Sequence, residues 1–202
     1  LTTVAWRLNK KMSFALDGGI YITGAATQWL RDGIKIINSA SETEQMAYDA
    51  GSHGGVYFVP AFSGLAAPPW DSYARGTMVG ITGGTTREHI VRATLESTAY
   101  QVKDNLDVMN MDASMPITVL RADGGAAANK FLMQFQADLI GIPVDVPEIK
   151  DTTALGAAQL AALGAGEFDS IEQMEGTWKL AKRYAPKMSV DERESLLYNW
   201  HR

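Results

Sequence analysis

The spacing of hydrophobic and polar positions predicts two strands and two helices at the start of the chain. Apolar residues in Leu1–Trp6 and Ser13–Tyr21 flank a polar stretch around Asn9, Lys10 and Lys11, which favours a β-hairpin. Apolar residues then recur at helical spacing from about Thr23 to Ile37. Ser41, followed by acidic residues, is typical of the capped start of a short helix that runs to about Asp49.

The next stretch predicts two short strands and one long helix. The run GGVYFVPAF predicts a strand that ends at Pro60, and another strand is expected over Gly76–Ile81. Between them, the run SGLAAPPWDSYARG predicts an ordered loop, because Trp70 and Tyr73 are costly to leave in water. Apolar residues stepping by four and three along one face predict a helix from Thr86 to about Met109.

After Pro116, strands and helices alternate. Residues 117–121 predict a strand that ends at DGGAAA, which we expect to turn directly into a helix with Ala128, Leu132, Phe135 and Leu139 as its apolar stripe. Gly141 and Pro143 end that helix. A strand over Pro143–Pro147 comes next, followed by a helix over Thr152–Gly164 whose small residues would let it lie close against a sheet.

This order of elements predicts an α/β layered domain with a mostly parallel second half. At 202 residues the chain is long enough to bury a full hydrophobic core. We expect one domain over residues 1–165, with residues 166–202 as a helical extension of the same domain. The more polar extension favours two appended helices.

Composition narrows the class of protein. The net charge is −5 and the basic residues are scattered, which argues against a nucleic-acid surface. No apolar run approaches the roughly 20 residues that span a membrane, so we expect no membrane insertion. The absence of cysteine excludes disulfides and thiolate zinc sites and fits a cytoplasmic protein. Because the chain starts with Leu1 rather than Met, we expect a fragment of a longer protein.

The clearest candidate for chemistry is Asp123-Gly124-Gly125, between a strand and a helix. Two glycines permit close backbone approach, and a helix start offers unpaired N–H groups, which together suit a phosphate. A tight turn without a ligand is the alternative. Gly24, with Gln28 one turn later, marks a similar junction, where the Gln28 amide would contact a base or ribose or simply face solvent.

Other polar residues are less informative. Asp71 fits a cap or a surface charge, and Asp123 fits a metal ligand or a residue that orients its loop. The widely separated histidines, His53, His89 and His201, favour structural or solvated roles over a catalytic one. The sequence contains no P-loop, G-x-S-x-G or G-x-G-x-x-G motif.

Three segments resemble the C-terminal domain of the FGGY carbohydrate kinases, and the resemblance runs from about residue 1 to 200. They are PAFSGLAAPPWD, ARGTMVGITGGTTREHIVRATLES and LRADGGAAANKFLMQFQADLIGIPVDVPEIKDTTALGAAQLA. Within the family, the DGGA and TALGAA runs resemble the branch that acts on glycerol more than the xylulose or gluconate branches. The chain departs from the usual GLGAPYWD at Ala66 and Pro69.

The resemblance implies a ribonuclease H-like, actin-like ATPase domain with C-terminal helices. The first strand of that domain would lie upstream, so the fold would be incomplete, and we expect its open strand edges to be filled by association, rearrangement or swapping. By position, Gly24, Gln28, Gly125 and Asn129 match nucleotide-contacting residues, and Ala40 matches a position near the adenine. The implied ligands are ATP or ADP with Mg²⁺.

The implied activity is transfer of the γ-phosphate of ATP to glycerol, giving glycerol 3-phosphate, by a cytoplasmic homo-oligomer. The glycerol-contacting residues and the catalytic base of the family lie upstream, so we expect no catalytic residue and no activity in this chain alone. One alternative is another FGGY sugar or polyol kinase. A second is a non-catalytic actin-like nucleotide-binding module, which would lack the PAFSGL and ARGTMVGI segments.

Overall fold

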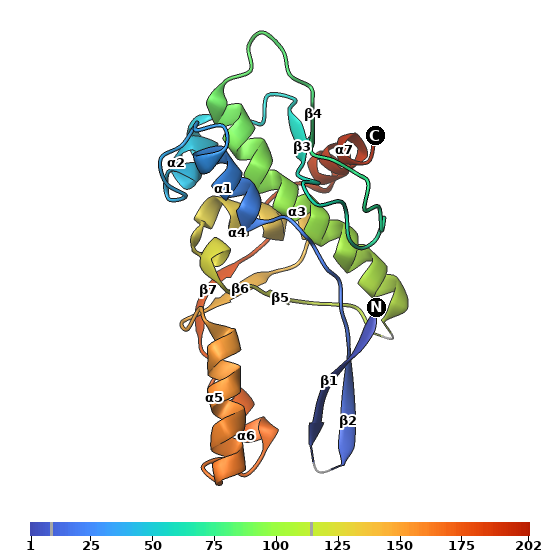
Figure 1. Ribbon diagram of the computed structural model, residues 1–202, viewed down its shortest axis with the longest axis vertical. Helices are drawn as coiled ribbons and strands as arrows, with labels where there is room; N and C mark the ends of the chain where they lie inside the picture. Colours follow the sequence, from blue (N-terminus) through green and yellow to red (C-terminus); the bar gives the residue numbers. More distant parts are fainter. Residues whose placement is uncertain (9, 114) are drawn as a thin grey trace. The chain divides into compact units, whose positions relative to one another are not determined.

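The chain forms two compact units. The computed structural model describes residues 1–8, 10–113 and 115–202 (Figure 1). Unit 1 comprises Leu1–Ile117 and Ser189–Arg202, and unit 2 comprises Thr118–Met188.

Unit 1 contains two antiparallel strand pairs and four helices within the described residues. They are β1 (Thr2–Leu8), β2 (Lys11–Leu16), α1 (Gly24–Asp32), α2 (Glu42–Asp49), β3 (Tyr57–Val59), β4 (Thr77–Val79), α3 (Arg87–Asp112) and α7 (Val190–Trp200). The predicted hairpin is confirmed as β1–β2, although its second strand lies earlier than expected. Asn9, which we placed between the strands, is outside the described residues.

The core of unit 1 lies between α1, α2, α3 and β3. One buried cluster joins Ile22, Ala26, Val56, Phe58 and Ala93, and a second joins Leu30, Ile37, Met46 and Val91. The long predicted helix is confirmed as α3. Its start is fixed because the Thr86 N–H donates to Nδ1 of His89 at 3.0 Å, so His89 has a structural role.

Helix α1 ends at Asp32, before the predicted end at Ile37. The Ile34 N–H bonds to the carbonyl of Trp29 at 3.1 Å, which closes the helix and turns the chain so that Ile37 is buried. A Cβ on Gly33 would lie 2.5 Å from Cδ1 of Trp29, so this turn favours glycine. At α2, Ser41 makes no side-chain cap; the Glu42 carboxylate instead accepts from the Asn38 and Ser39 N–H groups.

The expectation for the loop after β3 was wrong in one respect. Trp70 and Tyr73 are exposed, at 55% and 88%. Backbone bonds order the loop, including Leu65 N–H to the Asp71 carbonyl at 2.7 Å. Oδ1 of Asp71 accepts from the Tyr73 and Ala74 N–H groups, so Asp71 is a turn cap.

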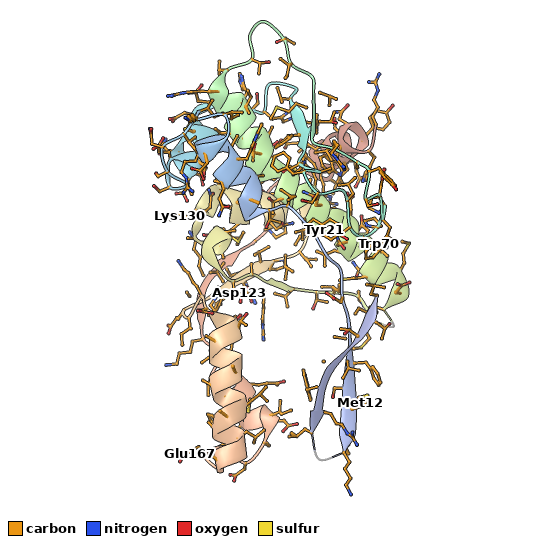
Figure 2. All side chains as sticks on the ribbon, in the orientation of Figure 1. Met12, Tyr21, Trp70, Asp123, Lys130 and Glu167 are labelled. Carbon is orange, nitrogen blue, oxygen red and sulfur yellow. The ribbon has the colours of Figure 1, made fainter. Side chains whose placement is uncertain are left out.

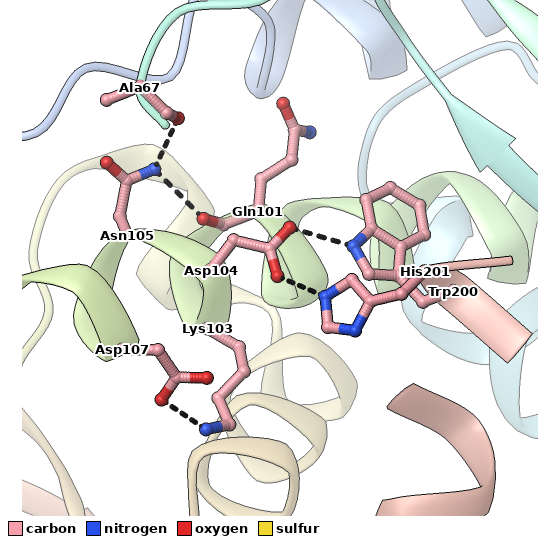
Figure 3. Close-up of polar contacts among 8 residues, drawn as sticks. All are labelled: Ala67, Gln101, Lys103, Asp104, Asn105, Asp107, Trp200 and His201. Carbon is pink, nitrogen blue, oxygen red and sulfur yellow. Dashed lines mark hydrogen bonds and ion pairs between the residues drawn. The ribbon is translucent and has the colours of Figure 1, made fainter. Parts of the chain in front are cut away.

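Helix α7 is attached to α3 through Asp104 (Figure 3). The carboxylate of Asp104, a residue of α3, accepts from Nε1 of Trp200 at 2.8 Å and pairs with Nε2 of His201 at 2.7 Å. The Trp200 ring also stacks on Tyr100, with ring centroids 4.8 Å apart. Trp200 and His201 therefore hold the C-terminal end of the chain to α3.

Unit 2 is built on a three-stranded sheet in the order β5-β6-β7. Its elements are β5 (Leu120–Arg121), the 3₁₀ turn η1 (Gly125–Ala128), α4 (Lys130–Ile140), β6 (Val144–Pro147), α5 (Thr152–Ala165), α6 (Ile171–Glu175) and β7 (Leu180–Tyr184). Strands β5 and β6 are parallel, as expected, but β6 and β7 are antiparallel.

Two expectations about unit 2 were wrong. The C-terminal tail, for which we expected two helices, also contains the strand β7 between α6 and α7. Because β7 lies at the edge of the sheet and is largely exposed, its residues are polar and lack the apolar alternation that would predict a strand. Its Arg183 binds the buried Asp145 of β6 through two 2.7 Å bonds. Helix α5 buries none of its residues and extends from the sheet with α6 beside it (Figure 1), rather than lying against it.

Candidate functional site

The loops that follow β5 and β6 form the candidate site of unit 2. Because these strands are parallel, their carboxyl ends meet at one edge of the sheet, where α/β proteins commonly bind ligands. The Gly124 N–H donates to the Lys150 carbonyl at 2.9 Å and joins the two loops.

A cavity of about 400 Å³ lies between these loops. It is lined by Asp123, Gly124, Gly125, Lys150, Asp151, Thr152 and Thr153. Figure 2 shows Asp123 close to the first turn of α5. Oδ1 of Asp151 accepts from the Ala154 N–H at 3.3 Å and caps that helix, so part of its charge is already engaged.

The two glycines have different roles. Gly124 has φ +75° and ψ −174°, a conformation that is essentially restricted to glycine, so it shapes the turn. Gly125 is not among the residues with positive φ, and a Cβ added to it would meet no atom within 4 Å. The backbone therefore does not require glycine at 125, and the open space over it suits the close approach of a ligand.

The helix after Gly125 does not begin at once, contrary to the expectation. The 3₁₀ turn η1 comes first, and α4 starts at Lys130. Asn129 is the N-cap of α4, because its Oδ1 accepts from the Leu132 N–H at 2.9 Å.

The other candidate residues belong to unit 1. Gly24 and Gln28 are exposed and lie four residues apart on α1, so they share a helix face. A Cβ on Gly24 would meet nothing within 4 Å. Ala40 is exposed just before α2, and its carbonyl accepts from Oγ1 of Thr43 at 2.7 Å.

The structure thus brings Gly24 together with Gln28, and Gly125 together with Asn129, in different units. Sequence reasoning missed the lining residues on the β6–α5 loop, Lys150, Asp151, Thr152 and Thr153. A signal was present in the sequence, because the loop that follows a second parallel strand begins at the same edge of the sheet.

A buried polar group outside these sites has strongly altered acidity. Burial raises the pKa of Glu96 on α3 to about 7, and the bonded guanidinium of Arg92 only partly offsets this. Arg92 also donates to the Ala47 carbonyl, which ties α3 to α2. Nearby, His53 packs against the Tyr57 ring at 4.7 Å, and burial lowers the pKa of this histidine.

Two kinds of feature are absent from the described residues, 1–8, 10–113 and 115–202. Within them no group of three or more His, Cys, Asp or Glu side chains could hold a metal ion. No helix in the same ranges is long and apolar enough to cross a bilayer.

Comparison with known proteins gives a family match. The model of the C-terminal domain of the FGGY family of carbohydrate kinases matches residues 2–165. Glycerol kinase 2 of Thermotoga maritima is 56% identical over 200 residues, covering 99% of this chain and 40% of that protein. A glycerol kinase of Nitratidesulfovibrio vulgaris is 54% identical over 202 residues, covering 100% of this chain and 41% of that protein.

Solved structures show the same likeness. Plasmodium falciparum glycerol kinase with ADP is 36% identical with a TM-score of 0.89, covering 100% of this chain and 40% of that chain. Xylulose kinase of Lactobacillus acidophilus, 21% identical with a TM-score of 0.78, covers 96% of this chain and 39% of that one and shows the fold alone.

These likenesses confirm the expected actin-like fold class. The chain spans about two fifths of the length of the curated relatives that it matches, and the match lies in their C-terminal part. The chain belongs to the FGGY family of carbohydrate kinases, as a C-terminal domain of that family.

Proposed function

We propose that this chain is the nucleotide-binding C-terminal part of an ATP-dependent glycerol kinase. The observation that carries the proposal is identity of 52–56% to glycerol kinases over 99% or more of the chain. The whole protein would transfer the γ-phosphate of ATP to glycerol, giving glycerol 3-phosphate. The family resemblance also leads us to propose a cytoplasmic homo-oligomer.

The geometry supports a nucleotide role for this part. Phosphoryl transfer depends on positioning and on electrostatic stabilisation of the phosphates. Gly125 offers open space over its backbone beside a cavity of about 400 Å³, and Gly24 offers the same over the start of α1. We propose that Gly24, Gln28, Ala40, Gly125 and Asn129 contact the nucleotide.

Magnesium would come to this site on the nucleotide. Mg²⁺ in kinases is usually bound by phosphates, waters and one or two carboxylates rather than by an all-protein cage. Asp123 and Asp151, which line the cavity, fit such a partial site. When bound, the ion neutralises charge on the phosphates. We propose that the base that activates glycerol lies outside this chain, which alone would be inactive.

A steady-state assay of the full-length polypeptide tests this proposal. Release of ADP would be followed with glycerol, xylulose and gluconate as separate acceptors, and the 202-residue chain would be the negative control. We expect kcat/KM for glycerol to exceed that for the other acceptors by at least about 100-fold, because a site built to bond particular hydroxyls rejects mismatched substrates. A higher value for xylulose or gluconate, or turnover by this chain alone, would contradict the proposal.

A further inference from the structure

Lys150 occupies a distinctive position in the cavity of unit 2. Lys150 is the one basic residue among the described residues that line the cavity, and the acidic residues of the lining are Asp123 and Asp151. Its backbone carbonyl accepts from the Gly124 N–H, so the residue is held against the Gly124-Gly125 turn. A ligand in this cavity therefore has both Gly125 and Lys150 in the surrounding wall.

The charges at the cavity make this lysine important for any anionic ligand. With Lys150, the lining carries two carboxylates and one ammonium. Without it, only the two carboxylates remain, and they would repel any phosphate oxygen that no bound cation neutralises. The Ala154 N–H, which donates to the Asp151 carboxylate at the start of α5, partly neutralises that carboxylate. Lys150 carries its ammonium on a flexible side chain, which can adjust its position to bind a phosphate.

We propose that Lys150 binds the phosphate chain of the nucleotide through a charge-assisted hydrogen bond. The inference rests on the proposed nucleotide role of this cavity and adds a residue that sequence reasoning did not identify. The proposal assigns Lys150 to one part of the nucleotide: the lysine contributes to binding of the phosphates and not to binding of the nucleoside.

Calorimetric titration of ADP and adenosine into the full-length polypeptide separates these contributions. Lys150→Ala and Lys150→Glu would be compared with Lys179→Glu, a matched change at an exposed lysine of unit 2 that lines a neighbouring cavity. The Gly124 bond uses the backbone carbonyl of residue 150, so the side-chain changes leave it in place.

We expect Lys150→Ala to raise the Kd for ADP about tenfold and Lys150→Glu to raise it further, with the Kd for adenosine and the Lys179→Glu variant unchanged. Unchanged ADP binding by Lys150→Glu, or an equal loss of ADP and adenosine, would overturn the proposal. A wild-type protein that binds neither ligand would instead contradict the proposed function itself.

Discussion

At the scale of single residues, the two neighbouring glycines have different roles: Gly124 shapes the backbone, and Gly125 leaves space for a ligand. Gly124 has a backbone conformation that side chains resist, while Gly125 has open space where a Cβ would lie. We predict that Gly124→Ala lowers the free energy of unfolding by about 1–3 kcal/mol. Gly125→Ala should change it by less than about 0.5 kcal/mol. Urea denaturation of the two variants compares them, and equal losses would contradict the assignment.

Glu96 gives a pH-dependence at the same scale. Its pKa is raised from 4.5 to about 7 in the folded chain, chiefly by burial. The folded state therefore holds an additional proton between these values, so the free energy of unfolding should fall as pH rises from about 4.5 to 7. The loss would be on the order of 3 kcal/mol and complete above the folded-state pKa.

The Glu96→Gln variant removes this titration. Subtracting its stability curve from that of the wild type cancels the other titrating groups and isolates the contribution of residue 96. A difference curve that is flat between about pH 4.5 and 7, or one that rises, would show that Glu96 is ionised in the folded chain throughout the range.

At the scale of elements, attachment of α7 to α3 depends on one carboxylate. Asp104 accepts from Trp200 and pairs with His201, and it is 20% exposed. We predict that Asp104→Ala lowers the free energy of unfolding by about 1–2 kcal/mol, because both partners lose a hydrogen bond. The near-ultraviolet circular dichroism of the stacked Trp200 ring should weaken as well.

Asp107→Ala is the matched control on the same helix. Asp107 pairs with Lys103 across one turn of α3 and is 48% exposed, so its loss should cost less than about 0.5 kcal/mol. If the two variants lose the same stability, the contacts of Asp104 do not hold α7 in place.

The sequence predicted the elements that have a periodic apolar face. Val91, Leu95, Ala99 and Leu106 lie on one stripe and are all buried in α3. It did not predict β7, because an exposed edge strand has no buried alternation to reveal it. Nor could it predict the exposure of Trp70 and Tyr73, which follows from backbone bonds within their loop. Of the candidate site, it located the Gly124-Gly125 turn and missed the facing β6–α5 loop.

At the scale of the whole molecule, this chain exposes apolar surface that a stable monomer normally covers. Val4 and Phe14, a cross-strand pair of the hairpin, are 51% and 64% exposed, and α5 buries no residue. Exposed apolar strands recruit other chains. We therefore predict that the 202-residue chain associates, with a sedimentation coefficient that rises with concentration.

Val4→Lys combined with Phe14→Lys should weaken this association, because the two changes place like charges on the apolar pair. Asp49→Asn with Glu44→Gln on α2 changes the net charge by the same two units and is the control for altered net charge away from the hairpin. Wild-type chain that stays monomeric at all concentrations would contradict the prediction.

The most direct test is titration of Mg-ADP into the full-length polypeptide and its Gly125→Val variant, with the free energy of unfolding measured for both. The structure gives residue 125 room for a side chain, so the variant should remain as stable as the wild type. We predict that the wild type binds Mg-ADP and that Gly125→Val loses this binding. Equal affinity of the two proteins, or a wild type that binds no nucleotide, would contradict a nucleotide site at the Gly124-Gly125 turn.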